Sequence, residues 1–299
     1  MARITSTFTV TASDRVSPTI QRVRFDVSDI TPFVESPNTD AYVKLLFADP
    51  TPTNSRATGT DSAEGTDDAS AAPPTMRTYT VHSVDEDDAS LAIDFALHGD
   101  LEPAASGENQ DSGDSTSDAS TVGIACRWAL SARPGDVIEA RGPGGAYSPD
   151  PSAVRHLICG DATAIPAIAA AVKALPDDAI ADVVVEAPDY ADVDLIDNHP
   201  GASITHVTPA SGPDAAPGDA LVEMTTAVVG KLASRTGFDP AGVQVFVHGE
   251  ANAVMKRIRP MLKDAGIQVR GASISGYWRV GRTEEGFRTW KKENRPDEA

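Results

Sequence analysis

Apolar and polar positions alternate through much of the first half of the chain, and this pattern predicts β-strands. In the segment TIQRVRFDV, for example, Val23, Phe25 and Val27 fall on one face, as a half-buried strand requires. The segments of this kind are FTVTA, TIQRVRFDV, AYVKLLF, MRTYTVHSV, LAIDFAL and DVIEARG. A closed six-stranded antiparallel β-barrel pairs all of them without leaving an exposed edge.

The second half of the chain alternates buried-type strands with helical segments. The predicted strands are HLICG, ADVVVEA, SITHV, VQVFVHG and IQVRGASI, and the predicted helices are TAIPAIAAAVKAL, ALVEMTTAVVGKLAS and ANAVMKRIRPMLKDAG. Such alternation indicates an open parallel α/β sheet, which binds ligands at the C-terminal ends of its strands. We therefore predict a β-barrel domain over residues 1–150 and an open parallel α/β domain over residues 151–299.

Two stretches inside the barrel domain lack any apolar periodicity. Residues 49–75 and 100–121 consist mainly of Ser, Thr, Gly, Ala, Asp and Pro, with an excess of acidic residues. Segments of this composition cannot bury enough apolar surface to offset the entropy of ordering. We predict that both are disordered acidic insertions.

Charge and composition exclude several classes of function. The formal net charge is -19, which argues against nucleic acid as the main partner because phosphate binding needs clustered Lys and Arg. The two cysteines, Cys126 and Cys159, are too few for a disulfide framework or for the four thiolates of an iron–sulfur cluster. No stretch approaches the roughly 18 apolar residues of a membrane span, and the N-terminus lacks a signal-peptide core. We expect a cytoplasmic protein without a built-in metal centre.

Candidate chemistry in the barrel begins at the tetrapeptide RTYT, where Arg77 and Tyr79 share one face of a predicted strand. An Arg beside an aromatic ring suits a ligand with both a phosphate and a flat π-system, although an ordinary cross-strand pair would look the same. Further on, DFALHG ends a strand at His98, and the small residues of GIACRWA open a predicted helix. Backbone N–H groups at such a helix start can meet a diphosphate, while His98 is equally compatible with a structural role.

Three further segments lie at strand ends of the second half. GDATAIPA follows HLIC, so that Asp161 or Thr163 can cap the next helix, and HGEA brings Gly249 and Glu250 to a second strand end at the same crevice. The alternative for both is strand–helix punctuation without a ligand. GYWRVG follows the last predicted strand, and its aromatic residues either cover a flat cofactor or close the core.

Taken in order, these segments resemble the siderophore-interacting protein family of FAD-dependent ferric-siderophore reductases, within the ferredoxin–NADP reductase superfamily. The resemblance rests on RTYT, DFALHG, the small residues before RWA, GDATAIPA, HGEA and GYWRVG, and it covers nearly the whole chain apart from the two insertions. It implies FAD in the barrel and NADH or NADPH as electron donor. The flavin would pass electrons to Fe(III) held by a siderophore and release Fe(II) for iron acquisition, which requires no metal ligand and no acid–base residue from the protein.

The resemblance also implies positions for the cofactor-binding residues. Those expected along the flavin and its phosphates are Arg77, Tyr79 and Thr80, and those expected around the diphosphate are Asp94, His98, Ala125 and Cys126. Those expected at the crevice are Asp161, Thr163, Gly249 and Glu250, and those expected close to the isoalloxazine are Tyr277, Trp278 and Arg279. The chain departs from the family pattern at His82, where an Arg is usual, and at Cys126, where a Ser or Thr is common.

The sequence leaves alternatives open for the substrate site, the electron donor and the function. Basic residues at the C-terminal end could attract an anionic ferric siderophore, unless they form a solvated helix; they are Arg282, Arg288, Lys291 and Lys292. Glu186, at the end of the second parallel strand, favours NADH because an acid there suits ribose hydroxyls and disfavours a 2′-phosphate. A reduced ferredoxin is another possible donor. The competing functions are a general flavin-dependent reductase of other small oxidants and a non-catalytic binder of ferric siderophore.

Overall fold

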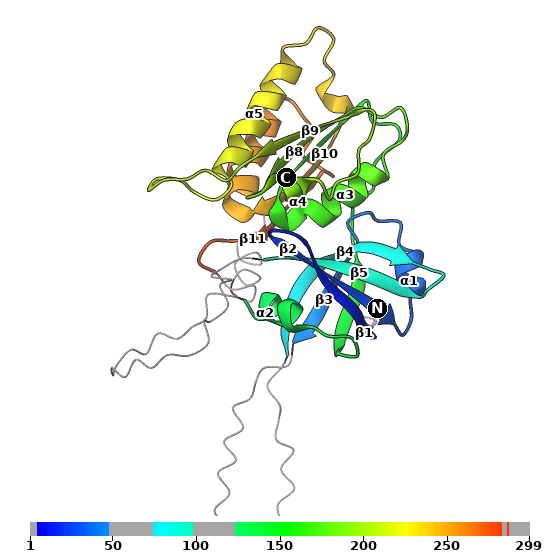
Figure 1. Ribbon diagram of the computed structural model, residues 1–299. Helices are drawn as coiled ribbons and strands as arrows, with labels where there is room; N and C mark the ends of the chain where they lie inside the picture. The colour runs from blue at the N-terminus through cyan, green and yellow to red at the C-terminus, as the bar shows by residue number, and fades with distance from the viewer. Residues whose placement is uncertain (1–4, 48–73, 98–122, 283–285, 287–299) are drawn as a thin grey trace, which may run out of the picture.

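The computed structural model describes residues 5–47, 74–97, 123–282 and 286. It contains a barrel and a separate sheet covered by helices, stacked along one axis of the molecule (Figure 1). The two predicted insertions lie almost wholly outside the described residues, and the prediction that they are disordered stays a prediction.

The first half of the chain forms a closed antiparallel barrel with the strand order β1-β2-β5-β4-β3-β6. Its strands are β1 (Thr5–Ser17), β2 (Ile20–Val27), β3 (Tyr42–Phe47), β4 (Thr75–Asp85), β5 (Ser90–Ala96) and β6 (Val137–Gly144). Pairing of β1 with β6 closes the barrel and leaves no free edge. The predicted six-stranded barrel is therefore confirmed.

Aromatic side chains on the inward positions of these strands fill the barrel. Phe8, Phe25 and Phe95 are fully buried, as the alternation of the sequence predicts. Helix α2 (Ile124–Ser131) covers one end of this core, where Trp128 stacks on Phe25 with ring centroids 6.2 Å apart. A short helix, α1 (Thr31–Val34), adds one more ring to the same cluster.

The second half forms a five-stranded parallel sheet with the order β11-β10-β7-β8-β9. Its strands are β7 (Arg155–Asp161), β8 (Ala181–Glu186), β9 (Ala202–Val207), β10 (Val243–Glu250) and β11 (Ser273–Trp278). From β7 the chain adds β8 and β9 on one side of the sheet, and it then returns to add β10 and β11 on the other side. The topological switch point therefore lies between β7 and β10, where open α/β sheets bind ligands.

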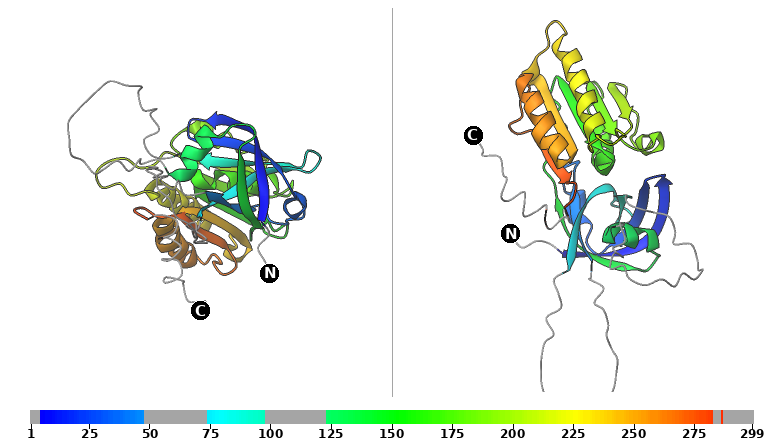
Figure 2. Two further views of the ribbon diagram at one scale, coloured as in Figure 1. Left: turned by 90° about the horizontal axis from the view of Figure 1, so that it is seen from below. Right: turned by 90° about the vertical axis from the view of Figure 1, so that its left-hand side faces the viewer.

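Helices cover both faces of this sheet, because its strands are apolar on both sides. They are η1 (Ala162–Ala164), α3 (Ile165–Lys173), α4 (Tyr190–Val193), α5 (Asp219–Ala233), η2 (Pro240–Gly242), η3 (Ala253–Ile258) and α6 (Arg259–Asp264). Helix α5 and the η3–α6 segment pack together on one face, as Figure 2 shows. Helix α3 packs on the other face, in a cluster that includes Ile20 and Tyr147 from the barrel side.

At the C-terminal elements one prediction is wrong, the position of the last strand, while the predicted helix is confirmed. The last strand was expected at IQVRGASI, but β11 begins only at Ser273, so Tyr277 and Trp278 lie within the strand and not beyond it. Ile267 is buried by packing of a loop, and Gly271 turns the chain with φ +77° before the strand starts. In the predicted helix, residues 253–258 form a π-helical stretch.

Polar contacts join the barrel to the sheet domain. The fully buried carboxylate of Asp192 accepts hydrogen bonds from the hydroxyls of Ser17 and Thr19, the second at 2.7 Å. Gln244 on β10 accepts from the backbone N–H of Asp150 at 2.8 Å. In the part of the chain that the structure describes, every helix is too short or too polar to cross a bilayer.

Candidate functional site

Strand β4 carries the RTYT segment along the side of the barrel. The Tyr79 ring packs against Phe95 with centroids 4.4 Å apart, and Arg77 is half-buried two residues earlier on the same face. Thr80 alternates to the other face, where it is 8% exposed and lies near the phenol of Tyr277. Burial raises the pKa of Tyr277, so this phenol stays protonated at neutral pH.

The carboxyl ends of β7, β10 and β11 meet at Asp161. Its buried carboxylate accepts hydrogen bonds from the Thr163 backbone N–H at 3.0 Å and from the Trp278 indole N–H at 2.8 Å. Burial raises the pKa of Asp161, and these donors oppose the rise. A Cβ atom at Gly249 would lie 2.6 Å from Asp161 Oδ2, so glycine is needed for this approach. The switch point thus gathers four of the residues that sequence reasoning singled out.

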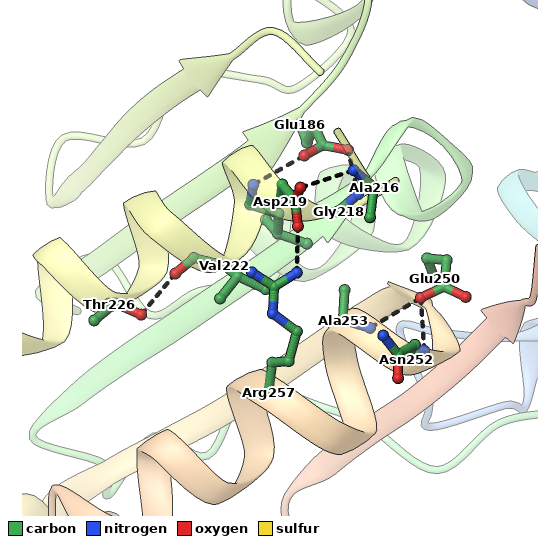
Figure 3. A network of polar contacts seen from close by, with 11 residues as sticks. Glu186, Ala216, Gly218, Asp219, Val222, Thr226, Glu250, Asn252, Ala253 and Arg257 are labelled. Atoms are coloured by element: carbon green, nitrogen blue, oxygen red, sulfur yellow. Dashed lines mark hydrogen bonds and ion pairs between the residues drawn. The ribbon is translucent and has the colours of Figure 1, made fainter. Parts of the chain in front are cut away.

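Glu186 is the last residue of β8, and its carboxylate caps the start of helix α5, which the sequence did not predict. Its buried carboxylate accepts from the backbone N–H groups of Gly218 at 3.2 Å and Leu221 at 2.9 Å, at the start of α5 (Figure 3). Burial is also the main cause of its raised pKa. Both oxygens of this carboxylate thus serve the helix, and its expected contact with ribose hydroxyls stays a prediction.

Glu250, at the end of β10, caps the next helical segment in the same way. It accepts from the N–H groups of Asn252 at 2.6 Å and Ala253 at 2.9 Å. Beside it, Asp219 forms an ion pair with Arg257, which links the first turn of α5 to η3 (Figure 3). Acidic groups thus already occupy the backbone donors at the starts of α5 and η3, along this edge of the sheet.

Asp94 does not serve the role that the resemblance implied. It faces Arg22 across the β2–β5 pairing and accepts two hydrogen bonds from the guanidinium, at 2.6 and 2.8 Å. His82 approaches the same carboxylate at 3.2 Å, from a β-bulge between Val81 and Ser83. The Asp94 side chain is 1% exposed. Burial works to raise its pKa, but the hydrogen bonds and charges of Arg22 and His82 outweigh it, and the net pKa is lowered. The same contacts account for the place of His82, whose Nδ1 lies beside the Asp94 carboxylate inside the barrel wall.

Helix α2 begins at the small residues whose backbone N–H groups the sequence suggested for a diphosphate. The N-cap residue of the helix is Gly123, which has no side chain to cap it, and backbone N–H groups at such a helix start can meet a phosphate. Ala125 is buried in the barrel core. The Cys126 thiol is 1% exposed and donates to the carbonyl of Ala96 at 3.5 Å.

The remaining predicted residues either follow β11 or lie outside the described residues. Arg279 is half-buried directly after β11, and Arg282 is exposed. His98, Arg288, Lys291 and Lys292 lie outside the described residues. Within the described ranges, no group of three or more His, Cys, Asp or Glu side chains is arranged to hold a metal ion.

Two basic residues that sequence reasoning missed lie on the outer face of the barrel. Lys44 on β3 is in register with Arg141 on β6 and with Thr78 on β4. The register places two cations in one row of the outer face, so this pair is a candidate binding point for an anion. The sequence shows a charged residue at an outward position of each strand. It does not show the strand register that brings Lys44 and Arg141 together.

The barrel residues fit a flavin dinucleotide. An Arg and an aromatic ring share one face of β4, α2 begins without a side-chain cap, and Tyr277 closes against Thr80 from the other domain. These are the features that a phosphate and a flat ring system need. The buried side chains of Asp94 and Cys126 do not contribute to that fit.

Comparison with known proteins agrees with this geometry. The siderophore-interacting FAD-binding domain model matches residues 9–147, and the siderophore-interacting protein model matches residues 153–281. The uncharacterized protein Rv2895c of Mycobacterium tuberculosis is 38% identical over 96% of this chain and 94% of its own length. The ferric vibriobactin reductase ViuB of Vibrio cholerae is 27% identical over 72% of this chain and 68% of its own length.

Among solved structures, a siderophore utilization protein from T. fusca is 29% identical and superposes with a TM-score of 0.66 over 95% of each chain. Together the two family models span the barrel and the parallel sheet almost from end to end. The chain belongs to the siderophore-interacting protein family, and its barrel is the FAD-binding domain of that family.

Proposed function

We propose that this chain is an FAD-dependent ferric-siderophore reductase, which releases Fe(II) for iron acquisition in the cytoplasm. In this proposal residues 1–150 bind FAD and residues 151–299 bind the nicotinamide donor. The observation that carries it is the match of both domains of the chain to the siderophore-interacting family models, with Tyr277 packed in the cluster at the contact between barrel and sheet. The likeness to ferric vibriobactin reductase supports the same activity.

Bound FAD supplies the redox chemistry, since it accepts a hydride and can release electrons singly. Arg77 would hold a phosphate of the cofactor through charge-assisted hydrogen bonds. The Tyr79 ring, fixed against Phe95, would support the ring system. One NADH then reduces two ferric ions, with release of NAD⁺, one proton and two Fe(II). Hard oxygen ligands hold Fe(II) less tightly than Fe(III), so reduction favours release.

A ferric siderophore is often anionic, and the Lys44–Arg141 pair is the described feature that suits it best. The pair lies one row along the strands from Tyr42 and Thr80, on the same outer face. Thr80 in turn lies near Tyr277 of the sheet domain. A substrate held by Lys44 and Arg141 would therefore lie close to the cofactor.

The charge of the sheet edge favours NADH over NADPH as the donor. The backbone donors at the start of α5 already hold the Glu186 carboxylate, and those of η3 hold Glu250. An additional 2′-phosphate placed there would meet negative charge instead of free N–H groups. No observation favours a reduced ferredoxin as the donor.

The test is the visible spectrum of the purified full-length chain, supplied with FAD and titrated anaerobically with NADH and then with a ferric siderophore. Bleaching by NADH, recovery of colour with the ferric complex and trapping of Fe(II) by a chelator are the expected results. A chain that never takes up FAD would instead indicate a non-catalytic binder. Equal turnover with quinones and other non-iron oxidants would indicate a general flavin reductase.

A further inference from the structure

Tyr190 is an aromatic residue that the fold leaves in water. It is the first residue of helix α4, shortly after the end of β8, and it is 62% exposed. All other aromatic residues in the described part of the chain are buried or half-buried. An exposed ring gains free energy when another flat ring covers it, so a planar ligand is what this position suits.

The neighbour of the Tyr190 ring on β9 is held in one orientation. The ring lies against His206, with centroids 5.5 Å apart and planes at 78°. The Nε2 atom of His206 lies 2.8 Å from the carbonyl oxygen of Ala187. A carbonyl can only accept a hydrogen bond, so Nε2 carries the hydrogen and donates it. The imidazole is thereby fixed at the ends of β8 and β9, and the Tyr190 ring packs against a rigid support.

Helix α4 itself is anchored on both sides of Tyr190. The Asp189 carboxylate before it accepts a hydrogen bond from a backbone N–H of the first turn at 2.9 Å. The fully buried carboxylate of Asp192 after it accepts from the hydroxyls of Ser17 and Thr19 in the barrel. A binding surface that is already ordered loses little conformational entropy when a ligand arrives.

Tyr190 and His206 lie along the same sheet edge as the switch point. Asp161 at the end of β7 is in register with Glu186 on β8, and Glu186 is in register with Val207 on β9. Neighbouring strands are about 4.8 Å apart, so the end of β9 lies roughly 10 Å from the end of β7. A dinucleotide joins two flat rings through riboses and a diphosphate. With its nicotinamide at the switch point, its second ring extends to one side along this edge.

We propose that Tyr190 is the stacking platform for the adenine ring of the nicotinamide dinucleotide donor, and that His206 holds this platform in place. The inference rests on the proposed function, in which residues 151–299 bind that donor. Stacking of a base on an aromatic ring needs no cation from the protein. It therefore suits a sheet edge whose backbone donors are already occupied by Glu186 and Glu250.

The first test is titration calorimetry of the full chain with ADP-ribose, which carries the adenine, the diphosphate and both riboses of NADH but no nicotinamide. Tyr190→Ala removes the ring, and Tyr190→Phe keeps it. The matched control is Ile180→Ala, which removes a 46% exposed side chain directly before β8, at the opposite end of the same strand. In a second test the FAD-loaded proteins are mixed anaerobically with NADH, and the rate of flavin bleaching is followed against the NADH concentration.

We expect Tyr190→Ala to raise the dissociation constant of ADP-ribose about tenfold. Tyr190→Phe and Ile180→Ala should each change it less than twofold. The NADH concentration for half-maximal bleaching should rise with Tyr190→Ala by a similar factor, while the limiting rate stays the same. The reason is that stacking at the adenine end is equally strong before and during hydride transfer. His206→Ala should have a smaller effect, about threefold, because it removes only the support.

The inference is overturned if wild-type protein does not bind ADP-ribose, or if Tyr190→Ala binds it as tightly as the wild type. An equal loss of affinity in Tyr190→Phe or in Ile180→Ala would also overturn it, since the aromatic ring would then not be the cause. So would a slower limiting rate of bleaching with an unchanged half-maximal concentration. Wild-type protein that binds no FAD refutes the proposed function itself. The ADP-ribose titration needs no flavin, so the two failures are distinguishable.

Discussion

The barrel and the parallel sheet handle buried acidic groups in different ways. In the barrel, Asp94 is held by the guanidinium of Arg22, which lies opposite on a neighbouring strand. In the sheet, Asp161, Glu186 and Glu250 end their strands, and backbone N–H groups account for most of their hydrogen bonds. The first arrangement needs a partner cation of matching register, whereas the second needs only a helix that starts at the right place.

Because of this difference, the two domains offer different charges to a ligand. The barrel carries additional cations, with Lys44 opposite Arg141 on the outer face and half-buried Arg77 on the other face of β4. The sheet edge uses its own carboxylates where a phosphate would otherwise bind. Anionic ligands are therefore expected to depend mainly on the barrel.

Removal of the buried charge in the barrel is expected to have the largest effect. Asp94→Ala leaves the Arg22 guanidinium, whose side chain is 15% exposed, without its carboxylate. Loss of one partner of a buried ion pair costs about 3–5 kcal/mol, which chemical denaturation would measure as a lower free energy of unfolding. The matched control is Asp14→Asn, which breaks the exposed pair with Arg24 and costs less than about 1 kcal/mol. Similar losses for both variants would contradict the comparison.

Loss of a barrel cation is expected to weaken cofactor binding next most strongly. Arg77→Ala removes a guanidinium that is proposed to contact a phosphate, and a charge-assisted hydrogen bond contributes about 1.5–3 kcal/mol. The FAD dissociation constant, measured by quenching of flavin fluorescence, should rise between about tenfold and 100-fold. Arg24→Ala, at an exposed paired position on β2, serves as the control and should leave the constant unchanged. An unchanged constant for Arg77→Ala would remove this residue from the binding site.

At the sheet edge, removal of a capping carboxylate should cost less stability and change ligand preference. Glu186→Ala frees the N–H groups of Gly218 and Leu221, and loss of a helix cap costs about 0.5–2 kcal/mol. The freed N–H groups should then donate hydrogen bonds to a phosphate. Calorimetry should therefore detect tighter binding of 2′,5′-ADP than in the wild type. Glu223→Ala removes one charge from an exposed position of the same helix and should show neither change. Weaker binding of 2′,5′-ADP to Glu186→Ala would show that the carboxylate does not block the site.

The smallest effect is the opposite pH dependence of the two domains. The pKa of Asp94 is below its ordinary value of 3.8, so its stabilising contribution is present above that pH and is lost as pH falls through the folded-state value. Asp161 has a raised pKa, so wild-type stability declines as pH rises from 3.8 through its folded-state value. Unfolding free energies of Asp94→Asn and Asp161→Asn, each compared with the wild type across acidic pH, should therefore diverge in opposite directions. Parallel curves would refute the contrast.

Local patterns in the sequence were sufficient to predict the elements but not their pairing. Alternation around Val23 and Phe25 predicts β2, and the uninterrupted apolar run of β8 predicts a buried strand. The same reasoning misplaced the last strand, since Ile267 and Val269 alternate in a loop. Periodicity describes which face is buried and does not say what buries it.

The site depended on contacts between distant parts of the sequence. Glu186 reaches N–H groups 32 and 35 residues away, and Arg22 meets Asp94 across 72 residues. Both bulges, at His82 and at Tyr277, turn side chains to directions that strict alternation does not give. Sequence motifs therefore identified most of the crevice residues, while the partner of each one came only from the fold.

The hairpin of β3 and β4 has a practical consequence for engineering. Phe47 and Thr75 face each other as the last pair of this hairpin, so the two strands are already held together by the rest of the barrel. The entropic cost of the connection between them grows only with the logarithm of its length. A reporter module or an affinity tag could be inserted here with little loss of barrel stability, which offers a place to attach a fluorescent donor for watching the flavin band.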